Sequence, residues 1–450
     1  MLFTVPISQN DTAIDFSLIT TSSIHLNVAD ERNQNLSQAQ QEYLTKHRMC
    51  SHANGPWIQE LMRERKYDDG AGNILTLPPV LKTRHPTTKS CRLCKCAGCL
   101  LGKLGKRTLD DSTTTTHTEM ALKQGIVDPG QRVFCDQYES SVLGRRWDSF
   151  GREPDHERYR GGTLFCDGAS TYIHINHQSS LRTGDTLQGK HSFEEFASSV
   201  GVEIDEYRAD NHIFNSSEYL ADCKDLGQAM TYCGTGAHHQ NGAERAIQTV
   251  TRWARTLIID AAIHWPDEVD LDLWPMAMTH AVWVWNHLPK QGVGLSPLEL
   301  FTGVRADHTS LNRLHIWGCP VYMLEPKLQV NGASIPKWRK RSRLGQFLGF
   351  SPTHSTKVAM MRNVRTGHIS PQFHVVFDDL FSTVSTTFQD PSQNLDHVFS
   401  SNEWRNLLQH GSDLFILDDA DPPPLDVQWE DPDNTNCEHD VARLRRANQF

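Results

Sequence analysis

Short apolar runs alternate with helical segments over residues 132 to 262, and this alternation most restricts how the chain can fold. Three strand-like runs come first, and a helix, a strand, a helix, a strand and a long helix follow. Such an order is typical of a mixed α/β domain in which helices cover a sheet. The predicted elements are strands 132–138, 163–167 and 172–177, helix 189–200, strand 202–209, helix 217–226, strand 230–233 and helix 243–262.

The segments on either side of this core differ from it in composition. Residues 1–40 are rich in Ser, Thr, Asn and Gln and are predicted to form a weakly ordered leader. Residues 41–107, with a possible helix at 56–66, are predicted to form a small metal-stapled unit. The core and a helical extension are placed at 125–305. Short apolar runs around Gly and Pro at 311–384 predict a small β-rich module, and the remainder predicts a flexible tail, 385–450.

The acidity of the chain is concentrated in its tail. A formal net charge of −10 over 450 residues is unusual for a protein that binds nucleic acid. Residues 378–450, however, contain 15 acidic and 4 basic residues, which leaves a slight positive charge on the rest. No apolar run approaches the roughly 20 residues that a bilayer span needs, and the N-terminus lacks the basic region of a signal peptide. We therefore expect an intracellular protein without a membrane partner.

Three carboxylates stand where an α/β sheet could bring them together. Asp136 lies in the first predicted strand, Asp210 follows the strand that ends at Ala209, and Glu244 opens the long helix. Cleaving or joining a phosphodiester needs charge compensation on the attacking and leaving oxygens, which two metal ions roughly 3.5–4 Å apart supply. Carboxylates suit Mg²⁺ or Mn²⁺. Most acidic residues are solvated surface, but the turn Gln240-Asn-Gly242 delivers Glu244 into its helix, and this context favours a metal site.

From about Leu36 to Val384 the sequence resembles the integrase segment of a copia-type long-terminal-repeat retrotransposon polyprotein. The landmarks are Asp136-Gln-Tyr-Glu-Ser140, Arg208-Ala-Asp-Asn211, Gln240-Asn-Gly-Ala-Glu-Arg245 and Phe373-His-Val-Val-Phe-Asp378. The resemblance implies an RNase H-like core with Asp136, Asp210 and Glu244 in the three metal-ligand positions. It also implies a multimeric enzyme that cleaves the ends of its element with water and then joins the freed 3′-hydroxyl to target DNA.

Two positions depart from the pattern of that family. Only Ala243 separates Gly242 from Glu244, where the family usually has two residues, and one residue at a helix start turns a side chain by about 100°. His212 follows Asn211 where the family commonly has glycine, so a positive φ there would strain the backbone modestly. A degenerate or repurposed copy that folds and binds zinc and DNA without catalysis is therefore an alternative. An unrelated RNase H-type nuclease would not explain the flanking units.

A second group of candidate ligands precedes the core. His47 and His52 are separated by four residues, and Cys96 and Cys99 by two. Two imidazoles and two thiolates suit tetrahedral Zn²⁺, and a ligand pair at each end of a segment staples that segment shut. The resemblance implies a His-His-Cys-Cys zinc domain, and Leu100-Leu-Gly-Lys103 matches its usual continuation.

Other cysteines leave two alternatives to this zinc site. Cys91 and Cys94 have the same spacing as the favoured pair and compete with it. The cysteines could also be buried or exposed without any metal. Four cysteines within nine residues are hard to place in a core, and the chain has an odd number of cysteines, 11, so metal is favoured over disulfides.

Five cations and a tryptophan crowd into residues 337–343. Phosphate neutralisation with aromatic stacking suits DNA, while a solvated loop and a nuclear import signal are alternatives. The position within the β-rich module, where the family carries a DNA-binding region, favours DNA and a nuclear location. The cations are Lys337, Arg339, Lys340, Arg341 and Arg343.

Asp167 is the most tempting rival carboxylate, because it lies in a strand predicted to neighbour that of Asp136. We interpret it as a structural residue at a turn. The tryptophans at 274, 283 and 285 are interpreted as core or interface packing. Basic residues also cluster near the presumed zinc site, at positions 82, 84, 89, 92, 95, 103, 106 and 107.

Overall fold

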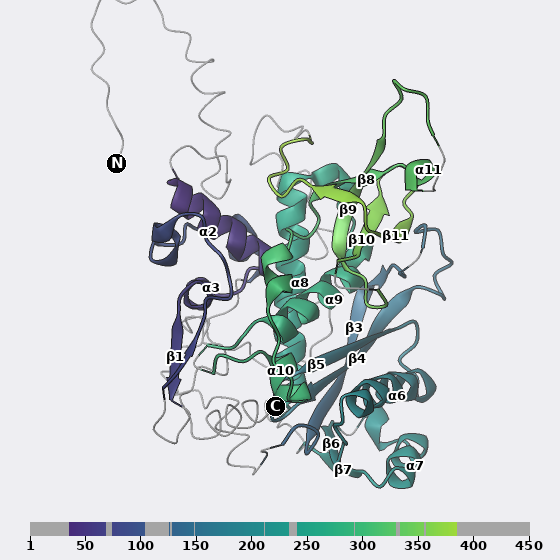
Figure 1. Ribbon diagram of the computed structural model, residues 1–450. Coiled ribbons are helices and arrows are strands. Elements are labelled where there is room, and N and C mark those ends of the chain that lie inside the picture. The colour runs from purple at the N-terminus through teal and green to yellow at the C-terminus, as the bar shows by residue number, and fades with distance from the viewer. Residues whose placement is uncertain are drawn as a thin grey trace, which may run out of the picture.

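The computed structural model (Figure 1) describes most of the chain between residues 36 and 384. The acidic tail and nearly all of the predicted leader lie outside the described residues. Helix α2, Gln38–Met49, nevertheless begins within the segment assigned to the leader, because Ser37 and Gln40 form a capping box at its N-terminus. The described residues are 36–68, 74–103, 126, 128–147, 149–210, 212–233, 241–291, 293–329, 334–354 and 357–384.

A five-stranded mixed sheet with the order β5-β4-β3-β6-β7 forms the centre of the molecule. Strands β3, β4 and β5 are antiparallel neighbours, whereas β6 and β7 run parallel to β3. The predicted mixed α/β core of the RNase H-like class is confirmed by this element order and sheet. The strands are β3 Val133–Gly144, β4 Tyr159–Asp167, β5 Ile173–Gln178, β6 Glu206–Ala209 and β7 Ala229–Tyr232.

Helices cover both faces of this sheet, because side chains alternate between the faces along each strand. On β3, Val133 and Cys135 pack in one apolar cluster with residues of the helices on one face. Phe134 and Tyr138 pack in a second cluster with residues of the helices on the opposite face. The first face carries α6 Thr183–Ser199 and α7 Ser217–Asp225, and the second carries α8 Gly242–His264 and α9 Trp274–His287.

The N-terminal unit packs against α8, which runs between this unit and the sheet (Figure 1). Helix α4 approaches α8 so closely that a Cβ on Gly102 would lie 2.9 Å from the Cα of Thr256, so glycine is required there. The helix predicted at 56–66 ends at Leu61, and its predicted last residues, Arg65 and Lys66, lie instead in the first strand of a hairpin that was not predicted. The unit contains α2, α3 Gly55–Leu61, β1 Arg65–Asp68, β2 Ile74–Leu77, η1 Pro86–Lys89 and α4 Ala97–Gly102.

The predicted β-rich module is a second five-stranded sheet, with the order β11-β10-β9-β8-β12 and antiparallel pairing throughout. Short helices connect it to the core. The strands are β8 Pro320–Leu324, β9 Ser342–Phe350, β10 Ala359–Asn363, β11 Ile369–Gln372 and β12 Val375–Phe377. The short helices of the chain are η2 Ile213–Asn215, η4 Pro266–Glu268, η5 Leu271–Leu273, α10 Pro297–Thr302, η6 Thr309–Arg313 and α11 Pro326–Gln329.

Two predictions about single residues are supported by the packing. Asp167 is fully buried at the end of β4, where its carboxylate accepts hydrogen bonds from the backbone of Gly130 and from Ser170. It therefore holds a turn and is not a metal ligand candidate. Trp274 and Trp285 are buried and donate to backbone carbonyls, while Trp283 is half-buried. In the described part of the chain, no helix is both long and apolar enough to cross a membrane.

Candidate metal centres

Asp136 and Asp210 extend from neighbouring parallel strands toward the same face of the sheet. In the parallel register Phe134 lies opposite Arg208, so Asp136 and Asp210 stand at equivalent positions two residues farther along. The alternate residues of both strands pack on the α6 face, Cys135 and Ala209 among them. Asp136 and Asp210 therefore belong to the face that α8 covers.

Glu244 reaches this face because the first turn of α8 is fixed to β3. Asn241 caps the helix by accepting a hydrogen bond from the backbone of Ala243. The same Asn241 side chain donates to the Cys135 carbonyl and to the Asp136 carboxylate, each over 3.4 Å. Glu244 is half-buried in this turn, and the Gln248 amide donates to it over 3.4 Å. The three carboxylates are thus presented by β3, by the residue that follows β6 and by the first turn of α8.

The negative charges of Asp136 and Asp210 raise the pKa values of two buried thiols nearby. Burial raises the pKa of Cys135 well above its usual value, and the neighbouring Asp136 charge adds to the shift. Burial also raises the pKa of Cys233; Arg208 opposes this shift, while Asp210 and Asp136 both reinforce it. Both aspartates are therefore close to Cys233, whose backbone N–H donates to Ala209. The resulting concentration of negative charge is what a divalent cation would neutralise.

The described residues contain two sets of side chains whose ligand atoms all lie within 4.8 Å of one another, and the carboxylate triad is not one of them. In a two-metal site the carboxylates are spread around a pair of ions, so this spacing does not decide between the two functional alternatives. His212, which was predicted to strain the backbone if φ were positive, has a φ of −70°. That prediction does not apply, because this φ is ordinary for any residue.

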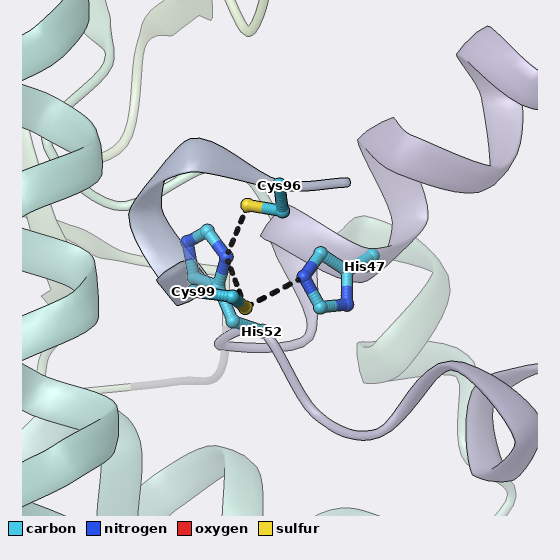
Figure 2. Close-up of side chains that lie close together, drawn as sticks. All are labelled: His47, His52, Cys96 and Cys99. Carbon is cyan, nitrogen blue, oxygen red and sulfur yellow. Dashed lines mark hydrogen bonds between the residues drawn. The ribbon is translucent and has the colours of Figure 1, made fainter. Parts of the chain in front are cut away.

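His47, His52, Cys96 and Cys99 form one of the two close sets (Figure 2). The His47 Nε2 atom lies 3.1 Å from the Cys99 sulfur, and the His52 Nδ1 atom lies 3.3 Å and 3.7 Å from the sulfurs of Cys96 and Cys99. Zinc with bonds of about 2.0–2.3 Å holds tetrahedral ligands roughly 3.3–3.8 Å apart. The residues therefore fit Zn²⁺. The competing Cys91 lies elsewhere, with its thiol near the Ala39 carbonyl.

The second nitrogen of each imidazole faces a protein oxygen, through a hydrogen bond for His47 and at a longer distance for His52. His47 Nδ1 lies 2.9 Å from the Ala53 carbonyl, which leaves Nε2 to face the thiols. His52 Nε2 lies 3.7 Å from a carboxylate oxygen of Asp260. Burial lowers the pKa of His52, which favours the neutral imidazole that a metal binds. Carbonyl and carboxylate partners of this kind orient metal-binding histidines.

Asp260 connects this site to helix α8. Its carboxylate also accepts from Arg48 over 2.8 Å, and both side chains are buried. Burial alone would raise the pKa of Asp260, but the charges of Arg48, His52 and His264 outweigh it and hold this pKa far below its usual value. The buried ion pair between Arg48 and Asp260 therefore lies directly beside the candidate zinc site.

Replacing Asp260 by asparagine should weaken zinc binding tenfold to roughly a hundredfold, because the partner that orients His52 is lost. A competition titration against a chromophoric zinc chelator measures this affinity. Arg48→Met is the matched control: it also breaks the ion pair, but it leaves the Asp260 carboxylate beside His52. Equal zinc affinities for Asp260→Asn and the unchanged protein would contradict the positioning role.

The other close set, His191, Glu194 and Asp222, already has an internal cation. The Lys190 ammonium is fully buried and lies 2.8 Å from Glu194 and 2.6 Å from Asp222. His191 also contacts Asp222. This set is therefore a salt-bridge network around a buried lysine, and it joins α6 to α7.

The cations at 337–343 follow α11 and lead into β9, and four of them are exposed together with Trp338, which is 91% exposed. Arg343 differs from the other four cations because its guanidinium forms a bidentate ion pair with the Glu325 carboxylate. Lys103, from the second basic stretch, is buried and donates to the His52 carbonyl, so it braces the zinc site candidate and does not face solvent. The exposed cations are Lys337, Arg339, Lys340 and Arg341.

Sequence reasoning missed three residues that shape these sites. Arg48 and Asp260 are separated by 212 positions, and no local pattern connects them. Asn241 carried a usable signal, because an asparagine directly before a helical run is a typical N-cap. That signal predicts the cap but not its contact with Asp136.

No family model matches the chain, and no curated protein is significantly similar to it. Solved structures resemble parts of it. The HTLV-2 integrase catalytic core domain in complex with magnesium, trimeric form, is 15% identical, with coverage of 38% of this chain and 97% of that chain at a TM-score of 0.27. A chain of the simian T-cell lymphotropic virus intasome in complex with PP2A regulatory subunit B56 gamma is 14% identical, with coverage of 63% and 87% and a TM-score of 0.31.

The catalytic core domain of BIV integrase is 12% identical, with coverage of 38% of this chain and 93% of that chain at a TM-score of 0.27. These identities and TM-scores are low. The functional reasoning therefore depends on the residues of the chain itself.

Proposed function

We propose that this chain is a retroelement integrase of the copia type, a metal-dependent enzyme that processes DNA 3′ ends and transfers them to target DNA. The observation that carries the proposal is the placement of Asp136 and Asp210 at equivalent positions of parallel neighbours, with the cap of the Glu244 helix bonded to Asp136. The sequence landmarks around all three residues support it as well.

In this proposal the three carboxylates together would hold divalent metal at the DNA backbone. Bound Mg²⁺ or Mn²⁺ would supply charge compensation on the attacking and leaving oxygens of a phosphodiester. Asp136 provides oxygens from within β3, Asp210 from the residue after β6, and Glu244 from the first turn of a capped helix. The Asn241 contact holds one carboxylate and the helix start in a fixed relation, which serves a site that must position its ligands closely.

The proposal includes zinc at His47, His52, Cys96 and Cys99, DNA as substrate and a homo-oligomer as the working form. The fit of the four ligand atoms supports the zinc. The exposed cations before β9 support DNA binding and are suited to a nuclear import signal. We therefore propose a nuclear location.

Neutralising the four exposed cations to glutamine should weaken DNA binding and its dependence on salt. Each phosphate contact that is lost should reduce the slope of log affinity against log salt by roughly 0.9. Fluorescence anisotropy with a labelled duplex at several salt concentrations measures both. Arg343→Gln is the matched control and should change the slope less, because Glu325 already neutralises Arg343. An equal or larger effect of Arg343→Gln would contradict the assignment.

A strand-transfer assay on the terminal sequence of the element tests the function. Labelled duplex and target DNA are incubated with the full chain in Mg²⁺, in Mn²⁺ and in a chelator. The proposal predicts joined product in either metal and none in the chelator.

The alternative is a degenerate or domesticated copy that binds zinc and DNA without catalysis. The short interval between Gly242 and Glu244 favours it, since the direction of the Glu244 carboxylate depends on this interval. This alternative predicts normal DNA affinity with no joined product in either metal. The assay and an anisotropy titration of the same preparation therefore separate the two.

A further inference from the structure

We propose that a pocket beside the β1–β2 hairpin binds a phosphate-bearing ligand of nucleotide size. The pocket has a volume of about 440 Å³, within the range of roughly 300–1,000 Å³ that small-molecule sites occupy. The hairpin forms one wall, and the segments that precede and follow α10 form the other. Leu77 of β2 packs against Leu295 and Leu300, so the two walls share a small apolar cluster.

Cationic side chains outnumber acidic ones in this pocket. Among the described residues, Lys82 and Arg313 form no ion pair, and both are exposed at the pocket. Among the described lining residues, two carboxylates, Glu299 and Asp307, are outnumbered by four cations, so this part of the lining carries a net positive charge. Such a lining attracts anions. The cations are Arg65, Lys82, Arg305 and Arg313.

Both carboxylates are already engaged by the protein. Glu299 accepts hydrogen bonds from the backbone of Ser296 and Ala306, over 2.8 Å and 2.9 Å, and lies 3.4 Å from His308 Nε2. Asp307 accepts from the backbone and the hydroxyl of Thr309. Neither carboxylate forms a described ion pair with Arg65 or Arg313, so these two arginines keep their capacity for an external anion.

Arg65 supplies a buried cation to the lining of this pocket. Its side chain is buried, at 5% exposure, yet it lines the pocket. It makes one long hydrogen bond, from Nη1 to the Gly294 carbonyl at 3.4 Å, and its buried Nε has no hydrogen-bond partner among the described residues. A buried guanidinium without an anion is costly. A phosphate can accept two parallel hydrogen bonds from one guanidinium and would relieve that cost.

The rest of the lining suggests what carries the phosphate. Pro78, Pro79 and Leu295 contribute apolar surface to the same pocket. The volume is much larger than a phosphate ion needs, so the phosphate should be attached to a body with an apolar or aromatic face. A nucleotide has this chemistry. It could be a free nucleotide or the terminal nucleotide of a DNA strand.

Isothermal titration calorimetry of the full, zinc-loaded chain with deoxyadenosine 5′-monophosphate and with deoxyadenosine tests the proposal. We expect the nucleotide to bind at least roughly tenfold more tightly than the nucleoside, because charge-assisted hydrogen bonds to the phosphate are lost in the latter. Equal affinities, or no nucleotide binding at millimolar concentration, would overturn it. A 5′-phosphorylated oligonucleotide that binds more tightly than its 5′-hydroxyl form identifies a DNA end as the source, whereas binding of the mononucleotide alone identifies a free nucleotide.

Variants tie the binding to the pocket. Arg65→Gln should lower the nucleotide affinity on the order of tenfold or more. Arg65 is buried, so Arg313→Gln at the exposed rim provides a second variant that leaves the packing intact, with a loss of several-fold expected. Arg365→Gln, an exposed arginine outside the pocket, should have no effect. Unchanged affinity in both Arg65→Gln and Arg313→Gln would place the ligand elsewhere and overturn the proposal.

This inference does not rest on the proposed strand transfer. Asp210→Asn should leave nucleotide affinity unchanged, since Asp210 is not part of the pocket lining. Loss of nucleotide binding in the pocket variants with strand transfer retained supports a site separate from the carboxylates. Failure of either proposal can therefore be recognised without the other.

Discussion

Asp210→Asn should lower the rate of strand transfer by about a hundredfold or more while the protein remains folded. An amide keeps the shape of the carboxylate but removes the negative charge that holds a divalent metal, and metal compensation contributes several kcal/mol to such reactions. Asp210 is half-buried after the last residue of β6, so the substitution leaves the strand and its packing intact. Gel analysis of joined product in Mg²⁺ measures the effect.

Asp205→Asn is the matched control for this substitution. Asp205 lies just before the opposite end of the same strand and is exposed, and its described hydrogen bonds involve only its backbone. It should retain full activity. Equal product from Asp210→Asn and the unchanged protein would exclude Asp210 as a catalytic ligand, whatever activity Asp205→Asn shows.

Removal of zinc should destabilise the N-terminal unit and the core helix against which it packs. Structural zinc contributes about 10–16 kcal/mol to the folding of small zinc domains. The apolar cluster around Tyr43 and Trp57 is continuous with residues of α8, so the loss should extend beyond the unit itself. We expect a strong chelator to lower the temperature of the first unfolding transition by at least roughly 10 °C. Differential scanning calorimetry with and without the chelator measures this.

Two serine substitutions separate the zinc ligands from the competing cysteines. Cys96→Ser should lose zinc and show the lower unfolding temperature even without chelator. Cys91→Ser should retain one equivalent of zinc, because the Cys91 thiol is turned toward the carbonyls of Ala39 and Thr88. Normal zinc content in Cys96→Ser, or its loss in Cys91→Ser, would reverse the assignment of the pair.

The order of the core elements could be predicted because each one carries its own local signal. On β3 the alternation of Phe134 and Tyr138 with Val133 and Cys135 is visible in the sequence, and it is the alternation that packs on two different helical layers. The long helix α8 was predicted to within two residues at each end, at Gly242 and His264. These signals depend on neighbours in sequence, so no tertiary information was needed.

Features that depend on distant contacts could not be predicted. The hairpin of β1 and β2 was missed because its strands have four residues each, and Leu77 packs in an apolar cluster with Val293, Leu295 and Leu300, which lie far along the chain. The sequence shows Lys103 only as one of several basic residues near the zinc ligands, whereas its contact with His52 and its position over the Trp253 ring place it inside. In each case the partner lies far along the chain, where composition and periodicity carry no information.

The same reasoning explains the carboxylate triad. The position of Asp136 in its strand and that of Asp210 just after a strand follow from local patterns, and the parallel pairing of β3 with β6 brings the two segments side by side. The effect of the missing residue before Glu244 cannot be predicted from local patterns, because it depends on where α8 packs. Asn241 fixes that start against β3.

The central claim is that Asp136, Asp210 and Glu244 together hold divalent metal. Crystals of the full chain soaked in Mn²⁺ and measured at a wavelength where manganese scatters anomalously test it most directly. We expect manganese peaks within bonding distance of all three carboxylates, and their loss in crystals of Asp210→Asn. Manganese bound elsewhere, or a Glu244 carboxylate that contacts no ion while the two aspartates do, would contradict the claim and support the inactive copy.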